Sequence, residues 1–204
     1  MTDRRRRALY AVRKCIPAAI LLAAVAALVL ADRWGLFGRA PRPDLEKYDF
    51  KTFAVLKVID GDTLDVKIPD GPHRRTRIRL WGVDTPELNL PPTPPQHFAK
   101  EAAEFARSLA MGKDVRLELV PHRTRDKYNR LLAYVTLPDG RMLNKLLIAE
   151  GAGYADPRFD HPLKSRFASF QRAAKVGRRG LWKDLKPRDL PYYYRNKIKL
   201  NHPD

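Results

Sequence analysis

Residues 76–83 read TRIRLWGV, and the acidic stretch DTPEL (84–88) follows them directly. Apolar side chains at alternating positions in the first stretch predict a β-strand. Alternation places Ile78, Leu80 and Asp84 on one face of that strand, so a carboxylate lies at the end of an apolar stripe. In a chain with a formal net charge of +17, this arrangement indicates either an ordinary polar turn or a site that binds its ligand through negative oxygen atoms.

Four further segments have the composition of strands. TFAVLKVID (52–60) and DTLDVKIP (62–69) precede the central strand, and only Gly61 separates them. KDVRLELV (113–120) and LLAYVTL (131–137) follow it. The first three strands are closely spaced along the chain, which predicts a meander.

Three helices are expected between and after these strands. The first places Phe98, Ala102, Phe105 and Leu109 at helical spacing and ends at Gly112. The second is the short segment from Met142 to Glu150. The third places Leu163, Phe167, Phe170 and Ala174 on one face and ends at Gly177. Five strands with a helix between the third and the fourth predict an α+β, mainly β fold. We expect a five-stranded barrel of the OB type with about three packed helices, a fold that often binds oligonucleotides.

Charge and cysteine content limit the classes of function. The positive net charge attracts polyanions, which makes nucleic acid or an anionic membrane surface the expected partner. The single cysteine, Cys15, excludes an internal disulfide framework and a cysteine zinc cage. The five histidines are scattered, so a zinc site is not expected.

The N-terminus has the pattern of a membrane anchor or an export signal. Six basic residues in segment 1–15 precede an uncharged run of 16 residues, 16–31. A helix that spans a bilayer usually needs about 17–25 residues, so the run is short for an anchor. A cleavable signal peptide has a similar layout, but Trp34 follows the run as an interfacial anchor would. We favour an uncleaved transmembrane anchor; in both cases the N-terminus stays in the cytoplasm and the remaining chain is exported.

The expected organisation therefore has five segments. The basic region 1–15 and the apolar helix 16–31 come first, followed by a linker at 32–48 that is rich in Gly, Pro and charge. The barrel domain covers 49–185, and a basic tail with three tyrosines covers 186–204. The tail either stacks on single-stranded nucleic acid or packs back on the barrel, which is the interpretation we favour.

A second aspartate is expected beside Asp84. Asp62, Leu64 and Val66 share one apolar face of their strand, so Asp62 lies at the mouth of that face. Two carboxylates at one rim of the barrel repel each other unless a cation lies between them or one is protonated. Carboxylates with backbone carbonyls suit a hard cation, calcium first and magnesium second.

Two arginines could bind phosphate near these acids. Arg130 directly precedes the last strand, and the planar guanidinium group offers a fork of donors to phosphate. Arg79 presents a difficulty, because strict alternation places it on the face opposite Asp84. A bulge at Gly82 would re-aim the chain and bring the two side chains together.

Four motifs in this order resemble the staphylococcal nuclease (thermonuclease) family. They are VIDGDT (58–63), RLWGVDTPE (79–87), RDKYNR (125–130) and GLW (180–182). The resemblance extends over roughly Asp49 to Asp184. It implies an OB barrel with packed helices and calcium-dependent cleavage of phosphodiester bonds in DNA and RNA.

The resemblance also implies roles for individual residues. Asp62, Asp84 and the Thr85 carbonyl would bind Ca²⁺, with Asp60 beside them. Glu87 would hold or deprotonate the attacking water.

The same resemblance implies which residues contact the substrate. Arg79 and Arg130 would bind the phosphate and stabilise the transition state, and Lys127 and Tyr128 would contact the nucleotide. Tyr154 and Phe159 are the candidates for an aromatic side chain that stacks on the base.

Taken together, we expect a monomeric, calcium-dependent endonuclease domain that acts on DNA, RNA or both outside the cytoplasm. It is either membrane-anchored or secreted after signal cleavage. The alternatives are a membrane-tethered OB module that binds nucleic acid without cutting it, and a tethered scaffold that contacts protein. Neither alternative gives a role to the clustered acids and arginines.

Overall fold

The computed structural model of the protein describes residues 23–27, 43–88 and 92–195. It forms two units, Met1–Pro43 and Asp44–Asp204. Residues 23–27 of the first unit are helical, and the rest of the predicted anchor at 16–31 lies outside the described residues. Among the described residues, no helix is both long and apolar enough to cross a membrane.

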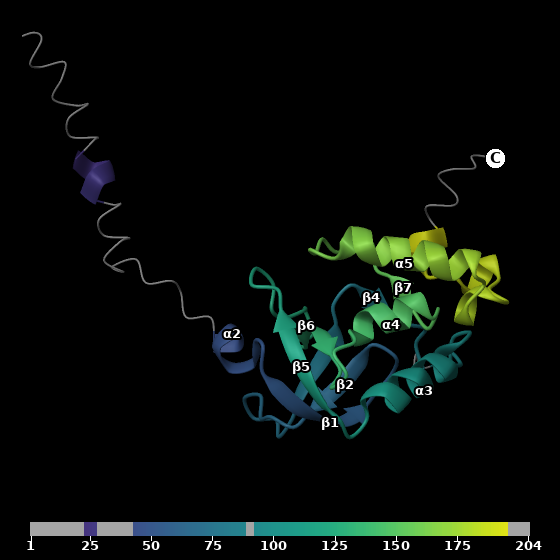
Figure 1. The fold of residues 1–204 in the computed structure, drawn as a ribbon, viewed down its shortest axis with the longest axis horizontal. Helices are drawn as coiled ribbons and strands as arrows, with labels where there is room; N and C mark the ends of the chain where they lie inside the picture. The colour runs from purple at the N-terminus through teal and green to yellow at the C-terminus, as the bar shows by residue number, and fades with distance from the viewer. Residues whose placement is uncertain (1–22, 28–42, 89–91, 196–204) are drawn as a thin grey trace, which may run out of the picture. The chain divides into compact units, whose positions relative to one another are not determined.

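Five strands close into a barrel in the second unit, as predicted (Figure 1). Around the barrel their order is β1 (Thr52–Val58), β2 (Thr63–Val66), β3 (Thr76–Leu80), β6 (Leu131–Thr136) and β5 (Asp114–Leu119). Strands β3 and β6 are parallel, and the other pairs are antiparallel. This closed arrangement confirms the mainly β barrel of the OB type.

The third strand is shorter than predicted. It ends at Leu80, and a turn at Trp81 and Gly82 separates it from β4 (Val83–Asp84). Strand β4 leaves the barrel and pairs with β7 (Tyr154–Ala155) in a separate two-stranded sheet. The interruption directs the acidic stretch away from the barrel wall.

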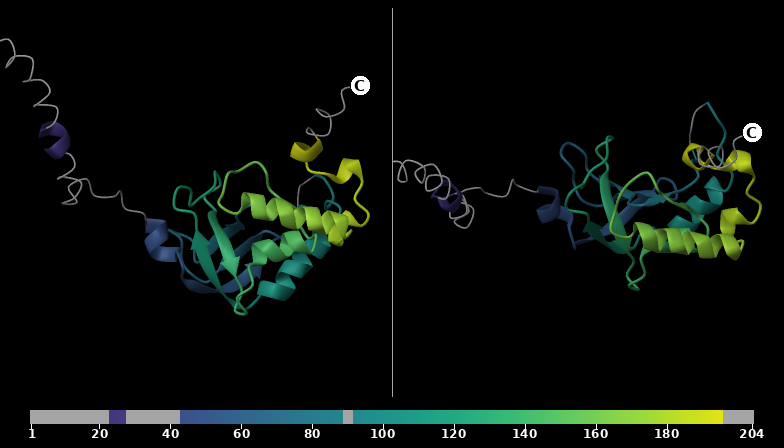
Figure 2. Two further views of the ribbon diagram at one scale, coloured as in Figure 1. Left: turned by 45° about the horizontal axis from the view of Figure 1, so that its top comes forward. Right: turned by 90° about the horizontal axis from the view of Figure 1, so that it is seen from above.

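The three predicted helices are present, and α4 lies between α3 and α5 (Figure 2). They are α3 (Ala99–Ala110), α4 (Leu143–Ala149) and α5 (Lys164–Val176); two short 3₁₀ helices follow, η1 (Gly180–Trp182) and η2 (Pro187–Asp189). The fully buried face of α3 consists of alanines, whereas Phe105 and Leu109 are partly buried at its edge. Small side chains let this helix approach the barrel closely. The largest fully buried side chains of the core include Leu64, Ile78, Leu117, Leu131, Leu147 and Phe167.

The predicted linker at 32–48 is wrong in its last six residues. These residues form the helix α2 (Pro43–Tyr48), and Tyr48 is fully buried. Asp44 of this helix binds Arg125, which also binds Asp70 in the turn before β3. The folded domain therefore begins near Asp44, because a long-range ion pair fixes a segment that has no periodic pattern.

Truncation of Arg125 to alanine is expected to lower the free energy of unfolding by about 2 kcal/mol, a value between those of surface and buried ion pairs. Hydrogen bonds from Arg125 lower the pKa of both Asp44 and Asp70 below their ordinary value of 3.8. A carboxyl group whose pKa is lowered in the folded state stabilises the fold at pH values above its ordinary pKa of 3.8. This stabilisation is lost as the pH falls through the folded-state pKa. Urea denaturation should therefore show a gap between wild type and variant at pH 7 that narrows at pH 3. A difference in the free energy of unfolding that is the same at pH 7 and pH 3 would contradict this expectation. Arg141→Ala, in an exposed pair with Asp139, is the control.

Candidate active site

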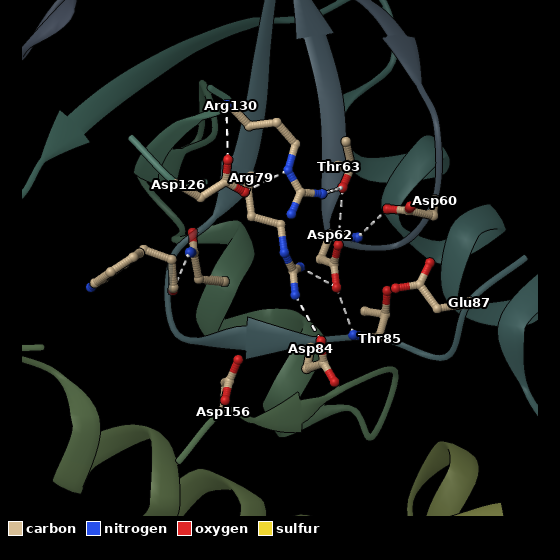
Figure 3. Close-up of polar contacts among 12 residues, drawn as sticks. Asp60, Asp62, Thr63, Arg79, Asp84, Thr85, Glu87, Asp126, Arg130 and Asp156 are labelled. Carbon is tan, nitrogen blue, oxygen red and sulfur yellow. Dashed lines mark hydrogen bonds and ion pairs between the residues drawn. The ribbon is translucent and has the colours of Figure 1, made fainter. Parts of the chain in front are cut away.

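The predicted site residues gather at one rim of the barrel, where β2 begins, β3 ends and β6 begins (Figure 3). Thr63 of β2 pairs with Arg79 of β3, and Ile78 of β3 pairs with Leu131 of β6. Strand register thus places the first residues of β2 and β6 beside the last residues of β3. Side chains from three separate segments can then reach a common space.

Gly82 brings Arg79 and Asp84 together. Its φ of +74° lies in the left-handed region, which glycine adopts at little cost. A Cβ atom at this position would meet the ring of His161 at 2.5 Å, so a side chain has no room there. Arg79 Nη2 donates to Asp84 Oδ1 at 2.7 Å. The expected redirection of the chain at Gly82 is confirmed, although it occurs by a turn between two strands instead of a bulge within one.

The guanidinium of Arg79 lies between two carboxylates (Figure 3). Its Nη1 forms an ion pair with Asp62, and its Nη2 forms one with Asp84. The Thr85 backbone N–H donates to Asp62 Oδ2 at 2.7 Å, and the Thr63 hydroxyl donates to Asp62 Oδ1 at 3.1 Å. Asp62 and Arg79 are both buried, so these contacts fix the positions of their charged groups.

Burial raises the pKa of the carboxyl groups of this cluster. It raises the pKa of Asp62 to about 6, against the opposing effect of Arg79. Burial also raises the pKa of Asp84, to which the charge of Asp62 contributes. The pKa of Glu87 rises by burial and by the charge of Asp62. Burial opposes the charged form of Arg79, but Asp62 and Asp84 outweigh it and raise its pKa, so this arginine stays positively charged.

Glu87 and Asp60 flank this cluster. The Glu87 N–H donates to Gln96 Oε1 at 2.9 Å, and the Gln96 N–H donates to the Glu87 carbonyl at 3.0 Å. These two bonds fix the backbone that carries the Glu87 carboxylate. Asp60 Oδ1 accepts from the Asp62 N–H at 3.2 Å, which places it beside Asp62 as expected.

Arg130 lies on the opposite side of the rim from β4. Its Nε donates to Asp126 Oδ2 at 2.7 Å, and its Nη1 approaches the Thr63 hydroxyl at 3.5 Å. Tyr128 is 67% exposed, with the Arg130 guanidinium 5.4 Å and the Lys127 ammonium 4.9 Å from its ring centre. The structure therefore brings Lys127, Tyr128 and Arg130 together at the surface, within reach of an arriving ligand.

Two residues of the site were not predicted from the sequence. Arg158 Nη2 contacts Asp84 Oδ1 at 2.9 Å, and the Tyr193 hydroxyl donates to Asp84 Oδ2 at 2.7 Å. Arg158 is itself held by Asp156, and its guanidinium lies 4.4 Å from the Tyr193 ring centre. The acid–arginine spacing in DPR (156–158) was a local clue to the first residue, whereas no local pattern points to the second.

The described part of the tail packs on the domain, in agreement with the interpretation we favoured. The Tyr194 hydroxyl donates to the Ala155 carbonyl at 2.8 Å, and Gln171 Nε2 donates to the same hydroxyl at 2.9 Å. Ala155 belongs to β7, which pairs with the strand that carries Asp84. The tail is thereby fixed next to the site.

A cleft of about 580 Å³ opens beside these residues. Polar side chains that line it include Arg79, Glu87, Arg130 and Arg158, and the aromatic rings of Trp81, Phe159 and Tyr192 also line it. Of the two aromatic candidates from the sequence, Phe159 lies in the cleft, whereas Tyr154 is buried against Trp182. The cleft combines anion-binding arginines with apolar surface, as a nucleotide site requires.

The donor chemistry of the rim fits a hard cation. Asp62, Asp84 and Glu87 supply carboxylate oxygens, whose pKa values are raised chiefly by burial, and carboxylate oxygens are calcium ligands. No group of three acidic, histidine or cysteine side chains is preassembled as a metal site within the ranges that the structure describes. Arg79 instead occupies the space between the two aspartates.

Comparisons with known proteins agree with the geometry. Residues 77–184 match the family described as "Staphylococcal nuclease homologue". The chain is 38% identical to a thermonuclease of Staphylococcus intermedius over 143 residues, 70% of this chain and 82% of the relative. It is 36% identical to a thermonuclease of Staphylococcus hyicus over 133 residues, 65% of this chain and 76% of the relative. An uncharacterized endonuclease of Escherichia coli is 31% identical over 134 residues, 65% of this chain and 78% of the relative.

Proposed function

Because this chain belongs to the staphylococcal nuclease homologue family, we propose that it is a calcium-dependent endonuclease that hydrolyses phosphodiester bonds in DNA, RNA or both. The observation that carries the proposal is the buried cluster of Asp62, Arg79 and Asp84 with Glu87 beside it. A binding module without catalysis has no need to gather Asp62, Asp84 and Glu87 at one rim and to bury Asp62 with Arg79, because removing charges from water costs stability. The matches to a thermonuclease and to endonucleases support the same reaction.

Calcium would be held by Asp62, Asp84 and the carbonyl of Thr85. When bound, it supplies positive charge against the negative charge that develops on the phosphate oxygens. Asp62 is already oriented for this role by the Thr85 N–H and the Thr63 hydroxyl. Arg158 and Tyr193 orient the carboxylate of Asp84 in the same way.

Glu87 is the proposed general base. Its carboxylate accepts a proton from water while the water oxygen attacks phosphorus, and the bond from phosphorus to the leaving oxygen breaks. A base is most effective when its pKa lies near the working pH, and burial moves the pKa of Glu87 in that direction. The two backbone bonds to Gln96 hold it in position for this step.

Arg79 and Arg130 are proposed to bind the phosphate from two sides. A guanidinium carries five N–H donors, and the contacts of Arg79 with Asp62 and Asp84 use only part of them. Arg130 is held through Nε by Asp126, which leaves its outer nitrogens directed toward Thr63 and the cleft. Donors fixed in advance stabilise developing charge without reorganisation. Lys127 and Tyr128 would contact the nucleotide next to this phosphate.

We further propose that the domain is monomeric and acts outside the cytoplasm. The six basic residues before the uncharged run 16–31 support an N-terminal anchor with a cytoplasmic N-terminus. Secretion after signal cleavage is the alternative. The intact mass of the native protein distinguishes the two, because cleavage near Ala31 removes the first segment.

Calcium dependence is tested by a cleavage assay on purified protein. We expect single-stranded DNA and RNA to be cut at mildly alkaline pH with calcium, no cleavage with excess chelator, and recovery when calcium is returned. Calcium should also raise the melting temperature, because an ion that binds only the folded state stabilises it. Metal-independent binding that leaves the strand intact would instead support a non-catalytic module.

A further inference from the structure

An arginine stripe runs along β3 away from the proposed active site. Arg77 and Arg79 stand at alternating positions of β3, so their side chains share one face of the strand, and Arg75 lies in the bend just before it. The side chains of Arg75, Arg77 and Arg79 are 52%, 45% and 11% exposed in that order. The stripe therefore leads from the buried cluster outward to solvent, with about 6.6 Å along the strand between Arg79 and Arg77, twice the rise per residue.

A single buried carboxylate holds the outer two arginines. Arg75 Nε contacts Asp65 Oδ2 at 2.7 Å, and Arg77 Nε donates to Asp65 Oδ1 at 2.9 Å. Asp65 is fully buried and is the only acidic group paired with either arginine in the described part of the chain. One negative charge thus orients two positive ones, and the trio keeps a net positive charge toward solvent.

These arginines line a second cavity of about 500 Å³. Arg130 and Tyr128 line both this cavity and the cleft of the site. The parallel register of β3 and β6 explains the connection, because it sets Ile78 opposite Leu131 and so brings Arg77 next to Arg130. The two cavities therefore adjoin at Tyr128 and Arg130.

We propose that the second cavity is a subsite for the phosphodiester backbone of a single-stranded nucleic acid, beyond the bond that is cut. This inference rests on the proposed nuclease function and defines its substrate as a strand longer than the scissile dinucleotide. The guanidinium groups of arginine bind phosphate, and their order along β3 and the bend before it suits a nucleic-acid strand that continues from Arg79 toward Arg75. A groove with aligned cations and an exposed ring at its edge is typical of single-strand binding.

The test compares a long and a short substrate in the full-length protein. In Arg75→Gln/Arg77→Gln, we expect kcat/KM for a strand of about 16 nucleotides to fall about tenfold, because two phosphate contacts are lost. For a dinucleotide, which fills only the first cleft, kcat/KM should stay within about twofold of wild type. The fall in kcat/KM should be the same for DNA and RNA strands of one sequence, because both have the same backbone phosphate.

A binding measurement separates this inference from the proposed function. Fluorescence anisotropy with chelator present should show weaker binding of the long strand, and the slope of log affinity against log salt should fall by about 1.4. Arg107→Gln/Arg141→Gln removes the same charge from exposed ion pairs on α3 and in the turn after β6, and should retain the wild-type slope. If wild type cuts neither substrate, the nuclease proposal fails, while the anisotropy comparison still decides on the subsite.

The double variant leaves Asp65 buried without its partners, so folding is checked by thermal melting. Arg75→Gln/Arg77→Gln/Asp65→Asn removes that charge as well and serves as the second variant. Equal losses on the long strand and the dinucleotide in a folded variant would overturn the inference, as would an unchanged salt slope.

Discussion

Replacement of Glu87 by glutamine is expected to lower the rate of phosphodiester cleavage by about 10²–10⁴-fold, the usual loss when a general base is removed. Glutamine has nearly the same size and leaves the backbone bonds to Gln96 in place. It cannot accept a proton from water at neutral pH. The loss should therefore appear in the single-turnover rate at saturating calcium, with little change in the affinity for the strand.

Glu101→Gln is the matched control, because Glu101 is exposed in the first turn of α3. This substitution removes the same charge from the domain, and the variant should cut at the wild-type rate. A Glu87→Gln enzyme within tenfold of wild type would show that another group takes the proton.

Arg79→Lys is expected to lower kcat/KM by about 10²–10³-fold, the loss typical of a removed transition-state donor. Lysine keeps the positive charge between Asp62 and Asp84 but lacks the planar fork, so it cannot contact both carboxylates and a phosphate together. Because one charge is retained, the melting temperature should change little. Steady-state kinetics and thermal melting together measure the two effects.

Arg79→Ala should in addition destabilise the fold by about 3–5 kcal/mol, because it leaves the buried Asp62 without its cation, whereas Asp84 keeps Arg158. Arg107→Lys on the exposed face of α3 is the control and should leave both activity and stability unchanged. If Arg79→Lys cut at the wild-type rate, a simple point charge would suffice there, and the proposed fork to phosphate would be wrong.

Sequence periodicity was sufficient to predict the strands of the barrel. Alternating apolar residues, as in β5, follow from burial of one face, whereas β6 is a continuous apolar run that is buried on both faces. The helix α2 and the pair β4–β7 were missed for a different reason. Each is too short to show a period, and each is fixed by distant partners such as Arg125 for Asp44.

The candidate site was predictable only where it depends on alternation within single strands. Alternation and the apolar stripes placed Asp62 and Asp84 at one rim, and the structure shows both bound to one guanidinium. Strict alternation carried past Leu80 placed Asp84 on the face opposite Arg79, because it does not include the left-handed turn at Gly82. Arg158 and Tyr193 could not be derived, since their contacts with Asp84 span 74 and 109 residues.

The contact between Tyr193 and Asp84 has a consequence for the order in which the domain is made. A ribosome synthesises Asp84 more than a hundred residues before Tyr193, and the hydroxyl that orients this carboxylate is thus among the last groups of the domain to leave the exit tunnel. Until then the rim lacks one of its anchors, although the barrel strands are complete by Thr136. The chain can therefore close its barrel before its proposed catalytic rim is fully assembled.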